Sequence, residues 1–297
     1  MIETQADAIG IIDEAGLTGK VRNLTPAHDG QLGLVAALML PDADLMKWEN
    51  IFAAPFDRFR RAAPIGAKFH ITDAFASSSA EWIAAAVEAR KGVFDLVKVH
   101  NLLVVYTARD ATIARRSHAL LKEVEDHARA SKLEHIAISQ RPSNTRHVAE
   151  CFQGVVSTID VLAETFQLQH VALYSDEIDP GVRADMESAA DRLRNLSKHQ
   201  VDIRGYNKVR NTPVLRSIAF SNDMPGIDVT RVGKIQEHGK ESSLVFAADV
   251  IANSLLHHLQ KLTPGSPLNT LRSVGGWILE KHVFAPPADD FDVYSKI

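Results

Sequence analysis

The 297-residue chain lacks the features that mark several large classes of protein. Its single cysteine, Cys151, cannot form a disulfide within the chain, and its apolar neighbours favour a small buried side chain over a nucleophile. No apolar run is long enough to span a bilayer, and no basic segment followed by an apolar one begins the chain. We therefore expect no membrane span, no signal peptide and a cytoplasmic, reducing location.

The chain also lacks an excess of positive charge. Its formal net charge is −4, whereas a dedicated nucleic-acid binder is usually basic, so any contact with nucleic acid must depend on a local patch. There is no Gly-rich phosphate loop, no His-Glu-x-x-His, no nucleophile elbow and no Cys-x-x-Cys pair. Nucleotide-driven, zinc-protease, serine-hydrolase and iron–sulfur functions are therefore without support.

Short apolar runs alternate with longer amphipathic segments along the whole chain. The expected strands are 8–13, 32–40, 68–72, 102–107, 135–139, 170–175, 201–206 and 215–221, each bounded by residues that favour turns. The expected helices are 43–59, 78–89, 113–130, 146–166, 182–196, 243–262 and 268–281. This mixture predicts an α/β fold in which helices flank a sheet.

One clear interruption, the Pro- and Gly-containing stretch at 263–267, divides the chain. We expect one α/β domain over residues 1–262, followed by a C-terminal helical extension and tail over residues 263–297. The extension is expected to pack back on the core. Alternatively, its Trp277 and Phe284 meet a partner chain, which makes the extension the candidate interface of an oligomer.

Two apolar runs end in adjacent acids. Asp13 ends the first expected strand and Glu14 follows it, and Asp176 and Glu177 follow the sixth. Side chains alternate across a strand, so one acid of each pair faces the side on which the apolar residues pack. A carboxylate there needs a partner or a metal, because burying an unpaired charge is costly. A helix N-cap explains Asp13 poorly, since no helix obviously follows it.

A weaker instance of the same pattern contains His70 and ends at Asp73. Helix capping explains Asp73 as well as a functional role does. His70 is equally consistent with a general base or ligand and with a hydrogen-bonded histidine at a strand end. Both residues are therefore secondary candidates for the site.

The most informative segment, 244–256, is apolar nearly all round a helix, which predicts a buried helix. Asp249 is its only charge, and Asn253 lies one turn further on the same side. In the middle of a helix Asp249 cannot act as a cap, so it must be hydrogen-bonded, ion-paired or bound to metal. We favour a functional role over a buried structural pair.

Acids on a first strand, a later strand and a late helix make the oxygen-rich ligand set that Mg²⁺ or Mn²⁺ prefers. Two such ions can activate water and stabilise the leaving oxygen in phosphodiester cleavage. We expect Asp13, Asp176 and Asp249 to be the metal ligands and catalytic residues. Glu14, Glu177 and Asp73 compete for the place of a fourth acid.

Four short motifs occur in order between about residues 8 and 260. They are Ile12-Asp13-Glu14-Ala15-Gly16, Phe69-His70-Ile71-Thr72-Asp73, Ser175-Asp176-Glu177 and Ala247-Ala248-Asp249-Val250-Ile251-Ala252. Together they resemble a bacterial domain-of-unknown-function family with a ribonuclease-H-like fold and an N-terminal Asp-Glu-Ser-Gly motif. The resemblance implies a mixed sheet flanked by helices, with an acidic site of the nuclease and integrase type. Ala15 stands where that family usually has Ser.

A basic stretch with one aromatic residue supplies candidate contacts to nucleic acid. Its members are Arg204, Tyr206, Lys208 and Arg210. Positive charge near a phosphodiester site would bind the backbone, and a tyrosine can stack on a base. The alternative is a solvated loop and strand edge.

These observations predict a nuclease that hydrolyses phosphodiesters in RNA or DNA through a carboxylate-bound Mg²⁺ or Mn²⁺ site. The alternative is a non-catalytic binding or regulatory module on the same fold, with its acids held in ion pairs by arginines. The net negative charge favours the alternative. So do Val245 and Phe246, which stand where the family often has a polar Gln.

Overall fold

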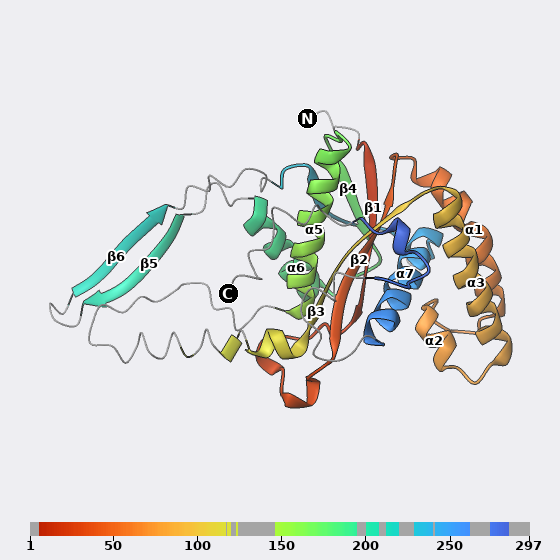
Figure 1. The fold of residues 1–297 in the computed structure, drawn as a ribbon, viewed down its shortest axis with the longest axis horizontal. Coiled ribbons are helices and arrows are strands. Elements are labelled where there is room, and N and C mark those ends of the chain that lie inside the picture. The colour runs from red at the N-terminus through yellow and green to blue at the C-terminus, as the bar shows by residue number, and fades with distance from the viewer. Residues whose placement is uncertain are drawn as a thin grey trace.

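The computed structural model describes residues 6–116, 118–119, 123, 146–194, 200–207, 212–219, 229–239, 241–261 and 274–284. Within them, five strands form one mixed sheet in the order β3-β2-β1-β4-β7 (Figure 1). The strands are β1 (Ala8–Gly16), β2 (Leu32–Leu40), β3 (Leu103–Asp110), β4 (Val171–Ser175) and β7 (Val232–Glu237). β1 and β3 pair antiparallel with β2, whereas β1, β4 and β7 run parallel.

Helices cover both faces of this sheet, which confirms the α/β architecture (Figure 1). The helices are α1 (Leu45–Ala62), α2 (Ile71–Ala76), α3 (Ala80–Val99), α5 (His147–Thr165), α6 (Pro180–Arg194) and α7 (Ser243–Gln260). Ile9 and Ile11 of β1 pack with α1, α3 and α7, while Ala8 and Ile12 pack with α5 and α6. All of β2 is buried, as its unbroken apolar sequence predicts for a strand covered on both faces.

Two further strands form a separate antiparallel hairpin. They are β5 (Gln200–Asn207) and β6 (Thr212–Ala219), and they lie apart from the main sheet in Figure 1. Strands were expected at 201–206 and 215–221, so the first is confirmed and the second begins earlier than expected. None of the described helices is long and apolar enough to cross a membrane.

Two expected elements are wrong. The segment 68–72 was expected to be a strand, but His70 is the N-cap of helix α2, whose Ile71 and Ala74 face the core at helical spacing. The helix expected at 268–281 is replaced over 274–279 by turns, where Gly276 has a positive φ of 80°, followed by a 3-10 helix at Glu280–His282. The strand expected at 135–139 lies outside the described residues.

The described part of the C-terminal extension packs back on the domain, as expected. Trp277 is buried and its ring N–H donates to Ser254 Oγ of α7 at 3.2 Å. The backbone N–H of Phe284 donates to the Val104 carbonyl of β3 at 2.9 Å. The extension therefore covers part of the β3 edge and one end of α7.

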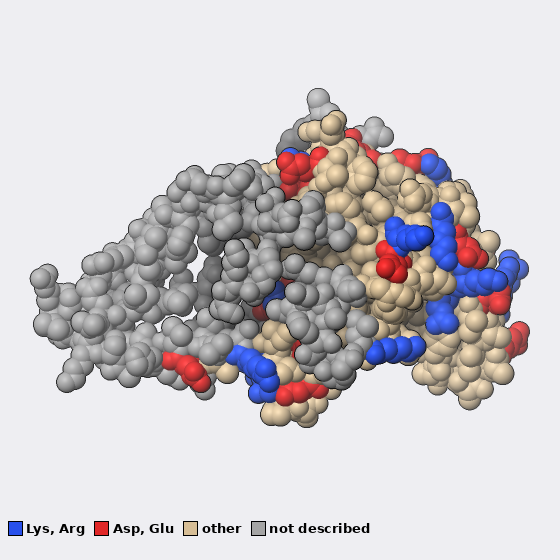
Figure 2. All heavy atoms as spheres, viewed as in Figure 1, with Lys and Arg blue, Asp and Glu red and all other residues tan. Residues whose placement is uncertain are grey.

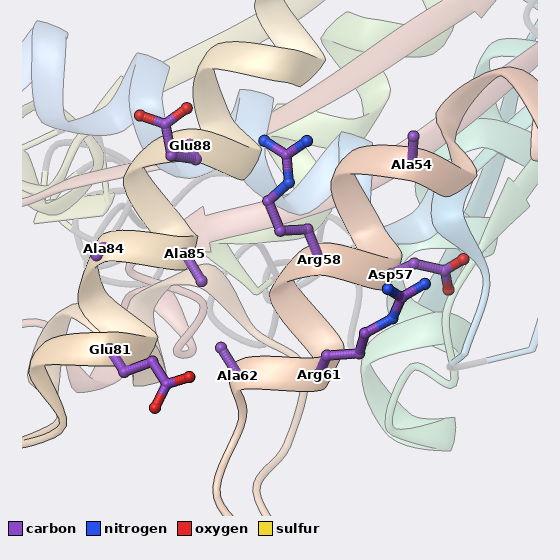
Figure 3. A pocket seen from close by; sticks show the side chains of 9 residues that line it. All are labelled: Ala54, Asp57, Arg58, Arg61, Ala62, Glu81, Ala84, Ala85 and Glu88. Carbon is purple, nitrogen blue, oxygen red and sulfur yellow. The ribbon is translucent and has the colours of Figure 1, made fainter.

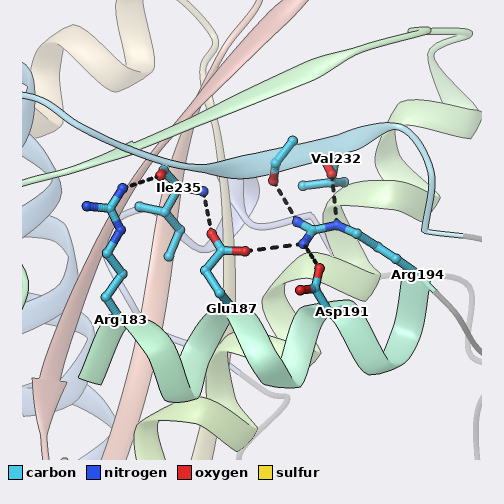
Figure 4. Close-up of polar contacts among 7 residues, drawn as sticks. Arg183, Glu187, Asp191, Arg194, Val232 and Ile235 are labelled. Carbon is cyan, nitrogen blue, oxygen red and sulfur yellow. Dashed lines mark hydrogen bonds and ion pairs between the residues drawn. The ribbon is translucent and has the colours of Figure 1, made fainter. Parts of the chain in front are cut away.

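Side chains of α6 satisfy the outer edge of β7, the last strand of the sheet (Figure 4). Glu187 accepts from the Ile235 N–H at 2.6 Å. Arg194 donates to the carbonyls of Val232 and Gly233, at 3.3 and 2.7 Å, and pairs with Glu187 at 3.2 Å. An edge strand exposes unpaired backbone groups, so this network protects the edge from pairing with another chain.

Loss of the Arg194 side chain should destabilise the protein. Arg194 and Glu187 are only 15% and 17% exposed, so Arg194→Ala leaves buried carbonyls and a carboxylate without their donor. We expect the free energy of unfolding to fall by about 2–4 kcal/mol. Urea unfolding measures the change. The exposed pair of Arg60 with Glu241 provides the control, since Arg60→Ala should cost less than about 1 kcal/mol.

Candidate acidic site

The first acid lies on the face of β1 that α7 covers. Asp13 follows Ile9 and Ile11 in steps of two residues, and both isoleucines belong to the core on that face. The Oδ2 atom of Asp13 is shielded from solvent and has no hydrogen-bond partner. A buried carboxylate oxygen in this state requires a proton or a cation.

The parallel pairing of β1 with β4 brings the second acid close to the first. Ile11 lies opposite Tyr174, so the residues two positions further along each chain, Asp13 and Asp176, reach the same level. β4 ends at Ser175, and Asp176 is the first residue beyond it. The register of two adjacent strands therefore joins acids that are remote in the sequence.

The third acid, Asp249, lies in the middle of α7 and is 5% exposed. Its Oδ1 accepts from Asn253 Nδ2 at 2.7 Å, and its Oδ2 accepts from the backbone N–H of Ile71 at 2.7 Å. His70 Nδ1 lies 3.8 Å from Asp249 Oδ1. Asn253 thus contacts Asp249 from one turn away, as the helical spacing predicts.

The N-terminus of α7 is anchored by a carboxylate of α1, which helps to set the position of Asp249. Glu49 accepts hydrogen bonds from the hydroxyls of Ser242 and Ser243 and from the Ser243 N–H. Its Oε1 also lies 2.7 Å from His238 Nε2. Burial alone would raise the pKa of Glu49, but these hydrogen bonds outweigh it and lower the pKa.

The acids act on one another electrostatically. Burial raises the pKa of Asp13 well above the usual value for an aspartate. The charges of Asp249, Glu14 and Asp176 raise that pKa further, in that order of size. Burial also raises the pKa of Glu14, and the charge of Asp176 adds to it. The structure therefore brings together four acids from β1, the end of β4 and α7.

His70 lies at the rim of this cluster, beside Asp249. Its interaction with Asp249 raises the pKa of His70, and the charges of Asp176 and Asp73 add to that shift. The side chain is 46% exposed, so it faces both the acids and the solvent. Asp73 is exposed in the first turn of α2 and is not its N-cap, a position that His70 occupies.

Other expected site residues lie elsewhere. Glu177 is exposed and is not among the charges that shift the pKa of Asp13 or Glu14. Arg204 and Tyr206 both belong to β5 of the separate hairpin. Lys208 and Arg210 lie outside the described residues.

Sequence reasoning missed the role of α2 in the site. Asp249 binds the first N–H of this helix, and the N-cap His70 makes no capping hydrogen bond through its side chain. A buried carboxylate of α7 therefore does what a capping side chain does in other helices. The sequence contains no local signal of this contact, because 178 positions separate Ile71 from Asp249.

Neither a metal cage nor an arginine pair is already formed. In the described part of the chain, no three or more His, Cys, Asp or Glu side chains are arranged to hold a metal ion. Within the same residues, no lysine or arginine forms an ion pair with Asp13 or Asp249. Asp176 is close enough to raise the pKa of both Asp13 and Glu14, and Asp249 is close enough to raise that of Asp13.

A surface hollow of about 660 Å³ lies between α1 and α3, away from the acids (Figure 3). Its lining includes Arg58 and Arg61 from α1 and Glu81 and Glu88 from α3, over a floor of alanines. Figure 2 likewise shows cationic and anionic side chains interspersed over the described surface on the viewed face. Mixed charge of this kind does not mark a ligand class.

Cys151 has no part in the site. It is fully buried in α5, and its Sγ donates to the Gly33 carbonyl at 3.4 Å. Burial raises the pKa of Cys151 to about 12, so the thiol stays protonated at neutral pH. The interpretation of Cys151 as a small buried side chain is confirmed.

No family model matches the chain, and neither does any curated protein or any solved structure. The resemblance carried by the four short motifs therefore stays a prediction.

The raised pKa of Asp13 makes stability depend on pH. The unfolded chain loses this proton near pH 4, whereas the folded protein keeps it to higher pH. The folded state binds more protons over that interval, so the contribution to stability is complete below about pH 4 and is lost as the pH rises through the folded pKa. Asp13→Asn, which cannot ionise, should match wild-type stability near pH 4 and exceed it at pH 7.

Thermal melts of both proteins in EDTA at the two pH values test this expectation. An Asp13→Asn variant whose melting temperature differs from wild type by the same amount at pH 4 and pH 7 would contradict it.

Proposed function

We propose that this protein is a ribonuclease-H-like phosphodiester hydrolase that depends on Mg²⁺ or Mn²⁺ and acts on RNA or DNA. One observation carries the proposal. Burial raises the pKa of Asp13, and the charges of Asp249 and Asp176, from two distant segments, raise it further. No lysine or arginine pairs with Asp13 or Asp249 in the described residues. A divalent cation would neutralise such a cluster, and carboxylate oxygens are the ligands that Mg²⁺ and Mn²⁺ prefer.

The side chains supply the carboxylate oxygens that such an ion prefers, although the described residues are not arranged around an ion in this structure. Asp13 Oδ2 is buried and unpartnered, so it gains most from a cation. Asp13, Asp176 and Asp249 would hold the ion, and Glu14 is the better fourth acid because its pKa responds to Asp176. Glu177, which is exposed, is the weaker choice. Bound Mg²⁺ or Mn²⁺ would supply Lewis acidity toward a phosphoryl oxygen and toward water.

The chain's own groups have defined tasks in this proposal. Asn253 and the Ile71 N–H hold the two oxygens of Asp249, which fixes the orientation of that carboxylate. His70 has a raised pKa and is partly exposed, so its charged form can attract a phosphate. The same group can donate a proton to the leaving oxygen. The buried setting strengthens each of these electrostatic effects.

The mixed sheet is consistent with the ribonuclease-H-like part of the proposal. β1 lies at the centre of the sheet, and its parallel neighbour β4 ends beside the acids of β1. Ligands of open α/β sheets characteristically bind beyond the carboxyl ends of parallel strands. In this proposal a substrate would approach the acids from this end of the sheet.

A specific observation favours the alternative, a non-catalytic binding or regulatory module. Both oxygens of Asp249 already accept hydrogen bonds from the protein, one of which caps α2. In that role Asp249 would be a structural anchor that needs no metal. The arginine pairs expected for such a module are absent from Asp13 and Asp249 among the described residues, so the anchor would act through hydrogen bonds.

Cleavage assays on Asp249→Asn test the enzymatic proposal. Loss of this carboxylate should lower Mg²⁺- or Mn²⁺-dependent cleavage of RNA, single-stranded DNA or duplex DNA by more than about 100-fold. The circular dichroism spectrum should remain that of wild type. Asp57→Asn, an acid beside the α1–α3 hollow, should retain full activity. A wild-type protein that cleaves none of these substrates with either ion refutes the claim.

Thermal melts with Mn²⁺ distinguish the two functions without a substrate. An ion that binds only the folded state stabilises it by about 2.7 kcal/mol at 100 times its Kd. The wild-type melting temperature should therefore rise by several degrees. Asp13→Asn and Asp249→Asn should show little of that rise. An unchanged wild-type melting temperature at millimolar Mn²⁺ favours the hydrogen-bonded anchor.

A further inference from the structure

Helix α2 connects the acidic site to an exposed aromatic ring. Its first N–H, on Ile71, binds Asp249, and the helix lies against α3 and α7 (Figure 1). Ile71 and Ala74 form its buried face, whereas Phe75 is 40% exposed. Phe75 follows Ile71 by four residues, a rise of about 6 Å along a helix axis. Phe75 therefore lies about one helical turn along α2 from the N–H that binds Asp249.

A cation from α3 lies over this ring. The Arg90 guanidinium carbon is 5.2 Å from the centre of the Phe75 ring. Within the described residues, no carboxylate forms an ion pair with Arg90. Its guanidinium packs on the Phe75 ring instead. The pair therefore combines the flat apolar surface of the Phe75 ring with a positive charge on Arg90 that no described carboxylate neutralises.

The chemistry of this pair fits one kind of ligand. Exposed aromatic rings stack on the bases of single strands whatever the base, and nearby cations bind the backbone. A guanidinium packed on a ring by its face still has its N–H groups at the edge, where they match a phosphate. Duplex DNA keeps its bases stacked on one another, so it would not use the ring.

We propose that Phe75 and Arg90 form a platform for single-stranded nucleic acid beside the acidic site. A base stacks on the exposed part of the Phe75 ring, and the Arg90 guanidinium binds an adjoining phosphate. Asp73 is exposed on the same helix and repels phosphate, which places the backbone on the side of α3. This inference rests on the proposed function, because it supplies the substrate class for that site.

Binding measurements test the platform separately from cleavage. The probe is a fluorescein-labelled single strand of about 15 nucleotides, as DNA or RNA, with EDTA present so that no cleavage occurs. Phe75→Ala should weaken binding roughly 5- to 100-fold, and Phe75→Trp should restore it. Arg90→Ala should reduce the slope of log affinity against log salt concentration by about the contribution of one phosphate contact.

Phe166 provides the matched control. It is 55% exposed at the C-cap of α5, on the opposite face of the sheet, so Phe166→Ala should bind as wild type does. A series of strands, each with one abasic position, adds a test that a structural role would not pass. For one abasic position, the wild-type protein should bind the abasic strand as weakly as Phe75→Ala binds the intact strand. Phe75→Ala should bind that abasic strand no more weakly still, because both changes remove the same stacking contact.

The outcomes separate this inference from the proposed function. Weaker binding by Phe75→Ala, in a protein that never cleaves, keeps the platform and refutes the hydrolase. Active cleavage with an unchanged KM for single strands in Phe75→Ala refutes the platform and keeps the hydrolase. Three further results overturn the platform. One is an equal loss of affinity in Phe75→Ala and Phe166→Ala, and another is a loss in Phe75→Ala that adds to the loss from every abasic position. The third is a wild-type protein that does not bind single strands.

Discussion

The site depends on one constraint, the burial of the Asp249 carboxylate in an otherwise apolar helix. A charge in this position persists only if donors surround it, and the structure supplies an amide from its own helix and a backbone N–H from another. Its charge adds to the effect of burial in raising the pKa of Asp13, and its interaction with His70 raises the pKa of that side chain. The start of α2 and the pKa shifts of Asp13 and His70 are thus all linked to this one side chain.

Contacts in other parts of the fold hold the helices and strands around Asp249 in place. Glu49 anchors the start of α7, so the depth of Asp249 against the sheet is set from α1. On the other face, Arg194 and Glu187 of α6 bind the outer edge of β7 and complete the sheet. The register between β1 and β4 then decides which acids meet. Function at such a site would use geometry that packing has already established.

Periodicity predicted most of this frame, because the elements involved bury continuous apolar faces. Residues 32–40 form a strand with the expected bounds, and Asp249 lies in the buried helix that its apolar neighbours indicate. The strand expected at 68–72 was wrong because Phe69 and Ile71 alternate with polar residues, which is the pattern of a strand. The helix that begins at Ile71 instead has its first N–H bound by a carboxylate 178 positions away, which the local pattern does not show. β7 was missed because an edge strand with Gly233 at its second position carries little apolar signal.

The contact between Asp249 and α2 uses the main chain of Ile71 rather than a side chain. Every amino acid except proline carries that donor, so substitutions along the helix leave the connection in place. Evolution can therefore alter the outward face of the helix, including Thr72 and Phe75, without loosening the carboxylate beneath it. The outer surface of α2 and the buried carboxylate are in this way separable, because the main chain alone joins them.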